Sequence, residues 1–276
     1  SLNQIALLQV RCNDTLRLIA KGEQAEDALA AFKQLAAENF GESLEPTQAK
    51  NAATQVPPMA TGTAFCYSPF SPEVSQQPAV SLQAEQQRLQ TAIQSTLSDL
   101  SELTALAEEK YSADIAAIFS GHHTLLDDPE LFDMACDVMR EKQCSAAWAW
   151  QQVLSELSQQ YLQLDDLYLQ ARYIDIEDLL SRSLQHLTGV TAQIPTFTRP
   201  TILVADVIYP STVLQLDPLT IKGICLRAGS EASHPAIIAR EMGLCWMCQQ
   251  GDTLNSIKMG DTLTLDCVAQ RITHAD

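Results

Sequence analysis

A strand, a turn and a helix follow one another within residues 220–243, an order that is typical of an α/β unit. The run 220–228 is short and largely apolar, which predicts a buried strand. Gly229 breaks the run, and Pro235 fits the first turn of a helix, where the N–H that proline lacks would have no partner. Gly243 can end this helix. This unit restricts the fold to one that contains a sheet with helical crossovers.

His234 lies at the start of the predicted helix. The first N–H groups of a helix have no partner inside it and its dipole is positive there, so an anion such as a phosphoryl group is favoured. The same positive end disfavours imidazolium and leaves a ring nitrogen free to attack phosphorus. The position therefore predicts a covalent phosphoryl carrier. A capping or surface histidine is the competing interpretation.

The residues around His234 resemble the phosphohistidine motif of Enzyme I of the bacterial sugar phosphotransferase system. The residues that match in spacing are Gly229, Ser233, His234, Ile237, Ala239 and Arg240. Three further blocks, at 118–128, 165–178 and 202–216, resemble the same family in the same order. The resemblance covers about Met59 to the C-terminus and implies that His234 is phosphorylated on Nε2. It also implies that Ser233, Arg240 and Arg172 support the phosphoryl oxygens.

The motif departs from the family at three positions. Ser230, Glu231 and Ala232 stand where the family has a glycine, an arginine and a threonine. The change removes a hydroxyl that could bond the histidine or its phosphate, and it replaces an attraction for phosphate by a repulsion. A module that docks a partner without being phosphorylated therefore stays open as an alternative.

Composition narrows the class of partner. The 276 residues carry a net charge of −17, which argues against nucleic acid and anionic membranes and favours a basic protein partner. We find no apolar run of the roughly 20 residues that a membrane helix needs, so we expect a cytoplasmic protein. The eight cysteines are expected to be reduced, with the C-x-x-C pair Cys245 and Cys248 packed in the core; a redox pair is the less favoured interpretation. No metal ion, nucleotide or other cofactor is predicted.

The first 42 residues resemble the C-terminal half of HPr, the phosphocarrier that exchanges phosphate with Enzyme I. Patterning predicts a helix over 1–9, an alternating strand over 15–20 and a helix over 23–40. Half of an HPr fold would be missing, so we expect the chain to be the C-terminal portion of a longer polypeptide. Residues 43–58 are rich in polar residues and proline and are interpreted as a linker.

Residues 59–276 are expected to form an Enzyme I-like domain of the α+β or α/β class. A helical bundle at about 79–189 is predicted to be inserted into a phosphohistidine (swivelling) α/β subdomain, formed by 59–78 and 190–276. Apolar periodicity predicts the helices: 81–110, about 115–126, 129–141, and 145–189 with a possible break. The last strand is predicted at 262–266.

The bundle is predicted to bind a partner. Ten acidic residues lie between residues 112 and 171, and only two basic residues accompany them. Such acidic residues form either a face exposed to solvent or a surface that binds a basic partner. The resemblance implies that HPr docks here, and the candidate contacts are Leu125, Leu126, Asp127, Asp128 and Glu130. His122 and His123 are neighbours on a helix and point apart, so we expect an orienting or packing role for them rather than a metal site.

An HPr-like segment before a truncated Enzyme I-like segment resembles the phosphoryl-donor subunits of phosphoenolpyruvate-dependent dihydroxyacetone kinases. That resemblance implies phosphate arriving from HPr on His234 and passing through upstream carriers to an ADP-bearing kinase subunit, with dihydroxyacetone as final acceptor. The barrel that binds phosphoenolpyruvate and magnesium in Enzyme I is not found in this sequence, so direct use of phosphoenolpyruvate is not expected. A multiphosphoryl transfer protein of a sugar-uptake system remains an alternative.

Overall fold

The computed structural model describes residues 2–8, 15, 17–37, 56–79 and 81–274. Residues 1–9 and 50–276 form one compact unit, and residues 10–49 form a second. This division differs from the predicted boundary at residue 42, because the first helix, α1 (Leu2–Leu7), packs with the larger unit. Most of the predicted linker at 43–58 lies outside the described residues.

The smaller unit contains one described helix, α2 (Ala25–Ala37), within the predicted range 23–40. The predicted strand at 15–20 is wrong: residue 15 and residues 17–20 have no strand conformation. Alternation of side chains favours a strand only when a neighbouring strand satisfies the backbone, and the described part of this unit offers none.

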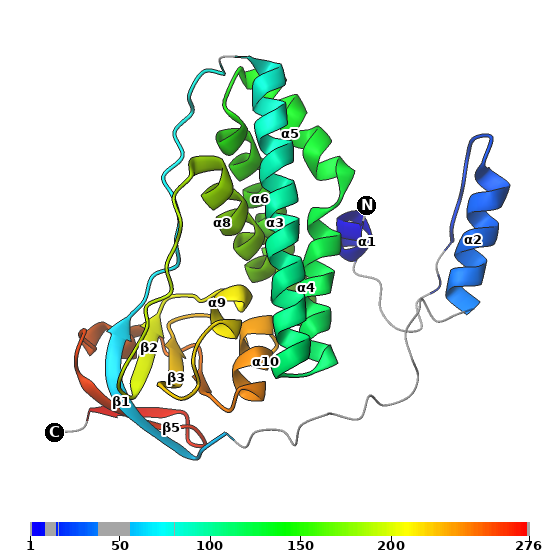
Figure 1. The fold of residues 1–276 in the computed structure, drawn as a ribbon. Coiled ribbons are helices and arrows are strands. Elements are labelled where there is room, and N and C mark those ends of the chain that lie inside the picture. The colour runs from blue at the N-terminus through cyan, green and yellow to red at the C-terminus, as the bar shows by residue number, and fades with distance from the viewer. Residues whose placement is uncertain (1, 9–14, 16, 38–55, 80, 275–276) are drawn as a thin grey trace. The chain divides into compact units, whose positions relative to one another are not determined.

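Six helices form the bundle of the larger unit (Figure 1). They are α3 (Leu82–Lys110), α4 (Ala113–Leu126), α5 (Pro129–Lys142), α6 (Ala146–Leu162), α7 (Leu167–Gln170) and α8 (Tyr173–Thr188). Ser81, Ser112, Asp128 and Ser145 each cap a helix by accepting a hydrogen bond from a first-turn N–H. The break expected within 145–189 falls between the end of α6 and the start of α8, at 163–172, and contains the short helix α7. Gly189 ends α8 in the left-handed conformation with φ of 70°.

The α/β part is built on one six-stranded sheet in the order β4-β3-β2-β1-β5-β6. Its strands are β1 (Met59–Cys66), β2 (Thr201–Ala205), β3 (Ile221–Leu226), β4 (Cys245–Met247), β5 (Thr262–Asp266) and β6 (Arg271–His274). The first four run parallel, whereas β5 and β6 are antiparallel to their neighbours. The predicted strand at 262–266 is confirmed as β5, but it is not the last strand, since β6 follows it. β6 is a short, mostly exposed edge strand with little apolar signal.

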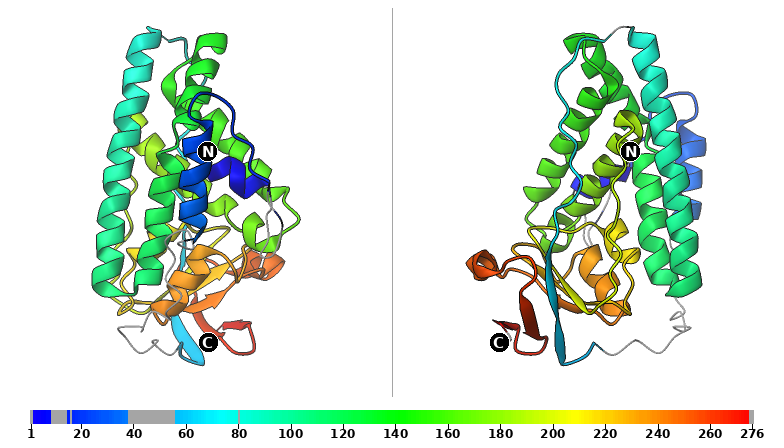
Figure 2. Two further views of the ribbon diagram at one scale, coloured as in Figure 1. Left: turned by 90° about the vertical axis from the view of Figure 1, so that its right-hand side faces the viewer. Right: turned by 60° about the vertical axis from the view of Figure 1, so that its left-hand side comes forward.

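The register of β1 and β2 shows that the bundle is an insertion. Thr63 pairs with Thr201, so two adjacent parallel strands are separated in sequence by all the bundle helices. One hydrophobic core continues from the bundle into the layer of α9 (Pro210–Leu214) and α10 (His234–Glu241) beside the sheet. Figure 2 shows the helices standing over one end of the α/β part from two further sides. The predicted class, a helical bundle inserted into an α/β subdomain, is confirmed.

A smaller core lies on the other face of the sheet and includes Leu263 and Leu265 of β5 together with Cys245 of β4. Although three strands lie between β4 and β5 in the sheet, Cys245 of β4 and Cys267, which follows β5, are joined by a disulfide. The expectation that all cysteines are reduced is therefore wrong for this pair. Cys248 is buried, as predicted for core packing, and burial raises its thiol pKa to about 11.

None of the described helices is both long enough and apolar enough to cross a bilayer.

Candidate functional site

His234 is the first residue of α10, at the point where the chain leaves the turn after β3. Ser233 is its N-cap, and Pro235 occupies the first turn as predicted. The His234 side chain is 17% exposed, so the ring is lined by protein on most sides but is still reached from solvent. The structure thus places this imidazole at a helix N-terminus, where positive potential favours a bound anion.

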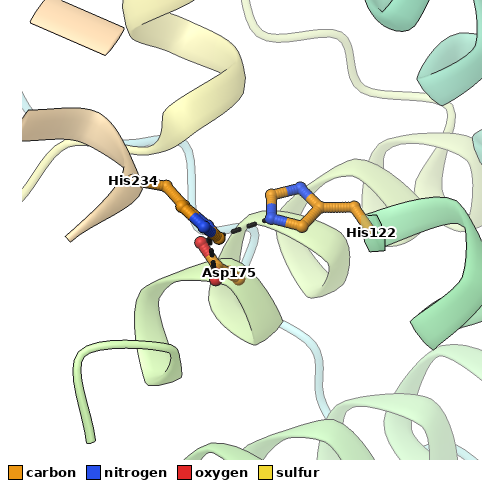
Figure 3. Close-up of side chains that lie close together, drawn as sticks. All are labelled: His122, Asp175 and His234. Carbon is orange, nitrogen blue, oxygen red and sulfur yellow. Dashed lines mark ion pairs between the residues drawn. The ribbon is translucent and has the colours of Figure 1, made fainter. Parts of the chain in front are cut away.

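Asp175 joins His234 to a second histidine (Figure 3). The Asp175 carboxylate, on α8, is buried, and its Oδ2 lies 2.8 Å from Nδ1 of His234. Its other oxygen, Oδ1, lies 3.3 Å from Nε2 of His122 on α4, which is also buried. Because Nδ1 of His234 faces the carboxylate, Nε2 is the nitrogen left for a reaction. The expected orienting or packing role of His122 agrees with this position.

Arg172 lies one helical turn before Asp175 and reaches two parts of the site. Its Nη2 donates a hydrogen bond to the carbonyl of Ala232, at 2.7 Å, while Nη1 lies 3.6 Å from Oδ2 of Asp175. The guanidinium also lies over the ring of Tyr168, 4.5 Å from its centroid. Arg172 therefore fixes the turn before His234 and supplies positive charge beside the buried carboxylate.

Burial and charge set the protonation states of this cluster. Burial lowers the pKa of His234 below its ordinary 6.5, against the opposing effect of Asp175, and Arg172 and His122 lower it further. Burial alone would raise the pKa of Asp175, but the neighbouring imidazoles His122 and His234 hold it well below its usual range. Near neutral pH the site therefore pairs a neutral His234 with an ionised Asp175.

The donor atoms of His122, Asp175 and His234 lie within 4.8 Å of one another, a spacing that a metal ion also accepts. The Arg172 guanidinium, however, already stands beside the carboxylate and repels a second cation. The arrangement suits a hydrogen-bonded nucleophile better than a metal centre.

Ser233 and Arg240, the other predicted supporting residues, use their side chains within the turn. Ser233 is buried and its Oγ donates to the carbonyl of Ser230, at 2.7 Å. Arg240 pairs with Glu231, whose carboxylate lies 3.0 Å from Nη1 and whose carbonyl accepts from Nη2 at 2.6 Å. The charge of Glu231 is thus offset by Arg240, and neither side chain is directed at the imidazole by these bonds.

The five predicted partner contacts divide into two groups. Leu126 is 1% exposed and belongs to the bundle core, so it is not open to a partner. Asp128 is buried as the N-cap of α5 and also accepts a hydrogen bond from Asn3, so it is covered while the first helix, α1, is in place. Leu125 is half-buried, whereas Asp127 and Glu130 are exposed.

The sequence alone does not predict a role for Asp175, although this residue belongs to the block at 165–178 that resembles Enzyme I. A usable signal exists, because Arg172, Asp175 and Asp178 repeat every third residue and so share a helix face. Asp178 is buried and accepts from the backbone N–H of Ser211, at 2.8 Å, and from its hydroxyl, at 2.6 Å. One face of α8 therefore holds the first turns of both α9 and α10.

Comparison with known proteins agrees with this architecture. Residues 52–172 match the family described as PEP-utilising enzyme, N-terminal, and residues 197–270 match the PEP-utilising enzyme, mobile domain. A solution structure of Enzyme I is similar in fold, with a TM-score of 0.61 at 22% identity over 79% of this chain and 89% of that one.

Two curated relatives are both named PEP-dependent dihydroxyacetone kinase, phosphoryl donor subunit DhaM. The protein of Escherichia coli strain K12 is 59% identical over 271 residues, which cover 98% of this chain and 57% of that protein. The protein of Klebsiella michiganensis is 57% identical over 272 residues, covering 99% of this chain and 57% of that protein. The chain thus spans a little over half the length of these relatives. Over nearly its whole length the chain is therefore similar to DhaM proteins, and it contains two regions that match the N-terminal and mobile domains of PEP-utilising enzymes.

Proposed function

We propose that His234 accepts a phosphoryl group on Nε2 from a phosphorylated carrier protein and passes it on to another carrier. The observation that supports this most directly is the 2.8 Å contact between Nδ1 of His234 and the buried Asp175 carboxylate. The contact fixes the tautomer with the proton on Nδ1, so the lone pair of Nε2 is available for attack.

The transfer exchanges one nitrogen–phosphorus bond for another. The bond between phosphorus and the donor nitrogen breaks as Nε2 of His234 forms its own, and no proton leaves Nδ1 in that step. Positive charge that develops on the His234 ring is stabilised by ionised Asp175, while the α10 N-terminus and Arg172 favour the phosphoryl oxygens. Catalysis then consists of alignment and charge neutralisation.

The relatives suggest the place of this step in a longer relay. Since they are named subunits of a PEP-dependent dihydroxyacetone kinase, we assign this chain to the same phosphotransfer sequence. HPr is the proposed donor, an ADP-bearing kinase subunit is the proposed recipient through further carrier domains, and dihydroxyacetone is the final acceptor. A cytoplasmic location is part of the same proposal.

Incubation with HPr phosphorylated by Enzyme I and phosphoenolpyruvate tests the assignment. We expect a phosphate on the wild-type chain that is labile in acid and stable in base, and none on His234→Ala. His186→Ala is a matched control, because His186 is partly exposed and pairs with Asp99 outside the site. Labelling that survives in His234→Ala would refute the proposal. HPr binding without labelling of the wild type would instead identify a docking module.

A further inference from the structure

The helix α1 lies on the bundle at the corner between α4 and α5 (Figure 1). Asn3 is 4% exposed, and its Nδ2 donates to the carbonyl of Leu125, at 3.4 Å, and to Oδ2 of Asp128, at 3.3 Å. Gln4 Nε2 lies 3.5 Å from Oε1 of Glu130. The three receiving residues all belong to the predicted partner contacts. The α1 segment thus occupies the surface assigned above to an incoming carrier.

A small cavity lies between described residues of α1 and the bundle. Leu7 packs against the bundle core, but a cavity of about 60 Å³ remains beside it. The bundle residues that line the cavity are Glu130, Leu131, Met134, Val153, Glu156, Leu157 and Gln160. A short helix seated over a residual cavity has fewer contacts to lose than a well-packed core helix, so we expect it to detach readily.

The polar groups of this surface determine which kind of helix can bind to it. Toward α1 it offers hydrogen-bond acceptors, namely the Leu125 carbonyl and the carboxylates of Asp128 and Glu130. Such a surface is complementary to a helix that carries amide or cationic donors beside an apolar residue. It also lies near the site along α4, because Leu125 is about one turn from the buried His122.

We propose that α1 is a resident occupant of the docking surface and that a phosphocarrier with a donor-bearing helix must displace it before reaching His234. This inference rests on the proposed function, since it takes HPr as the competing partner. If α1 covered the surface about nine-tenths of the time, the apparent Kd of HPr would be raised about tenfold over that of the open surface.

Asn3→Asp tests the displacement, because it places a carboxylate against two acceptors without changing side-chain size. Asn255→Asp is the matched control, since Asn255 also bonds a carboxylate, that of Asp252, but at an exposed position in the α/β part. Two quantities are measured on the full chain: amide exchange of residues 2–7, and the Kd for unphosphorylated HPr.

We expect protected α1 amides in the wild type, since a six-residue helix is not protected unless it is docked. Excess HPr should increase their exchange, and Asn3→Asp should increase it without HPr and tighten HPr binding about tenfold. Asn255→Asp should leave both quantities unchanged. The proposal is overturned by unprotected α1 amides in the wild type, by HPr binding that leaves α1 protected, or by absence of HPr binding to Asn3→Asp. This assay uses unphosphorylated HPr and does not depend on transfer of phosphate. If only the labelling of His234 failed, the proposed function would be refuted but the displacement of α1 by HPr would not.

Discussion

At the scale of residues, one buried carboxylate organises the site. Asp175 contacts the ring of His234 through one oxygen and that of His122 through the other, while Arg172 stands beside it. A buried charge is costly unless it is paired, so these partners stabilise each other as a set. The reactive histidine is thereby oriented by residues that are distant in sequence.

Asp175→Asn is expected to slow phosphorylation of His234 by about 10- to 100-fold. The variant replaces a hydrogen bond to a charged group, worth about 1.5–3 kcal/mol, by a neutral amide that fixes neither tautomer nor charge. The measurement is the single-turnover rate of labelling by phosphorylated HPr. Asp114→Asn, at an exposed position on α4, serves as control and should label at the wild-type rate. An unchanged rate in Asp175→Asn would show that the carboxylate does not position the ring.

Arg172→Lys is expected to slow labelling by roughly tenfold although it keeps the charge. A lysine cannot donate to Ala232, approach Asp175 and stack on Tyr168 with one planar group. Arg140→Lys, in an exposed ion pair with Asp137, should have no effect on the same rate. If the Arg172→Lys variant is labelled at the wild-type rate, the positive charge at position 172 is sufficient for labelling and the planar guanidinium group is not required.

At the scale of elements, α8 links the bundle to the α/β part. Its acids at positions 175 and 178 reach the first turns of α10 and α9, respectively. Asp178 accepts from a backbone N–H in the first turn of α9, whereas Asp175 contacts the side chain of the first residue of α10. The helix that positions the nucleophile thus also contacts both α9 and α10 of the α/β part.

Asp178→Ala is expected to lower the free energy of unfolding by about 2–4 kcal/mol, because the buried N–H and hydroxyl of Ser211 lose their acceptor. Urea unfolding followed by circular dichroism measures the change. Asp137→Ala removes a carboxylate from an exposed pair and should cost less than about 1 kcal/mol. Equal losses in the two variants would contradict a special role for the α8–α9 contact.

At the scale of the whole molecule, the site exists only where the bundle meets the α/β part. His122 and Asp175 come from the bundle, and His234 comes from the α/β part. A continuous hydrophobic core joins these parts and keeps water away from the carboxylate. The lowered pKa of His234 is a consequence of that junction, since burial is its largest cause.

The pH dependence of labelling follows from this burial. We expect the rate to hold as pH falls past 6.5 and to decline only when it passes the lowered pKa of His234, where the ring becomes protonated. Stability should decline on acidification as well, because the unfolded chain binds more protons when native pKa values of His234 and Asp175 are depressed. For His234 the loss begins as pH falls through 6.5, and for Asp175 only near the ordinary carboxyl range.

Nuclear magnetic resonance titration of the His234 ring measures the lowered pKa directly, and labelling rates between pH 5 and 8 test its consequence. His186, partly exposed beside Asp99, supplies the internal comparison. A His234 pKa at or above 6.5 would contradict the electrostatic account.

Features of this protein that depend on local chemistry can be predicted from its amino-acid sequence. Apolar periodicity placed the helices from α3 to α6, and two of the predicted ranges start at the residues that cap α3 and α6, Ser81 and Ser145. The glycine break and Pro235 located the start of α10 and with it His234. These features are readable because each depends on a few consecutive residues.

Contacts between side chains from different elements, in contrast, depend on how the chain packs in three dimensions. The pairing of Asp175 with His234, the offset of Glu231 by Arg240 and the Cys245–Cys267 bond join residues that lie apart along the chain. The burial of Leu126 and Asp128, and the absence of a strand at 17–20, likewise depend on packing or pairing partners rather than on local pattern. The physical reason is that burial, ion pairing and strand formation are energies between elements, fixed only when the elements pack together.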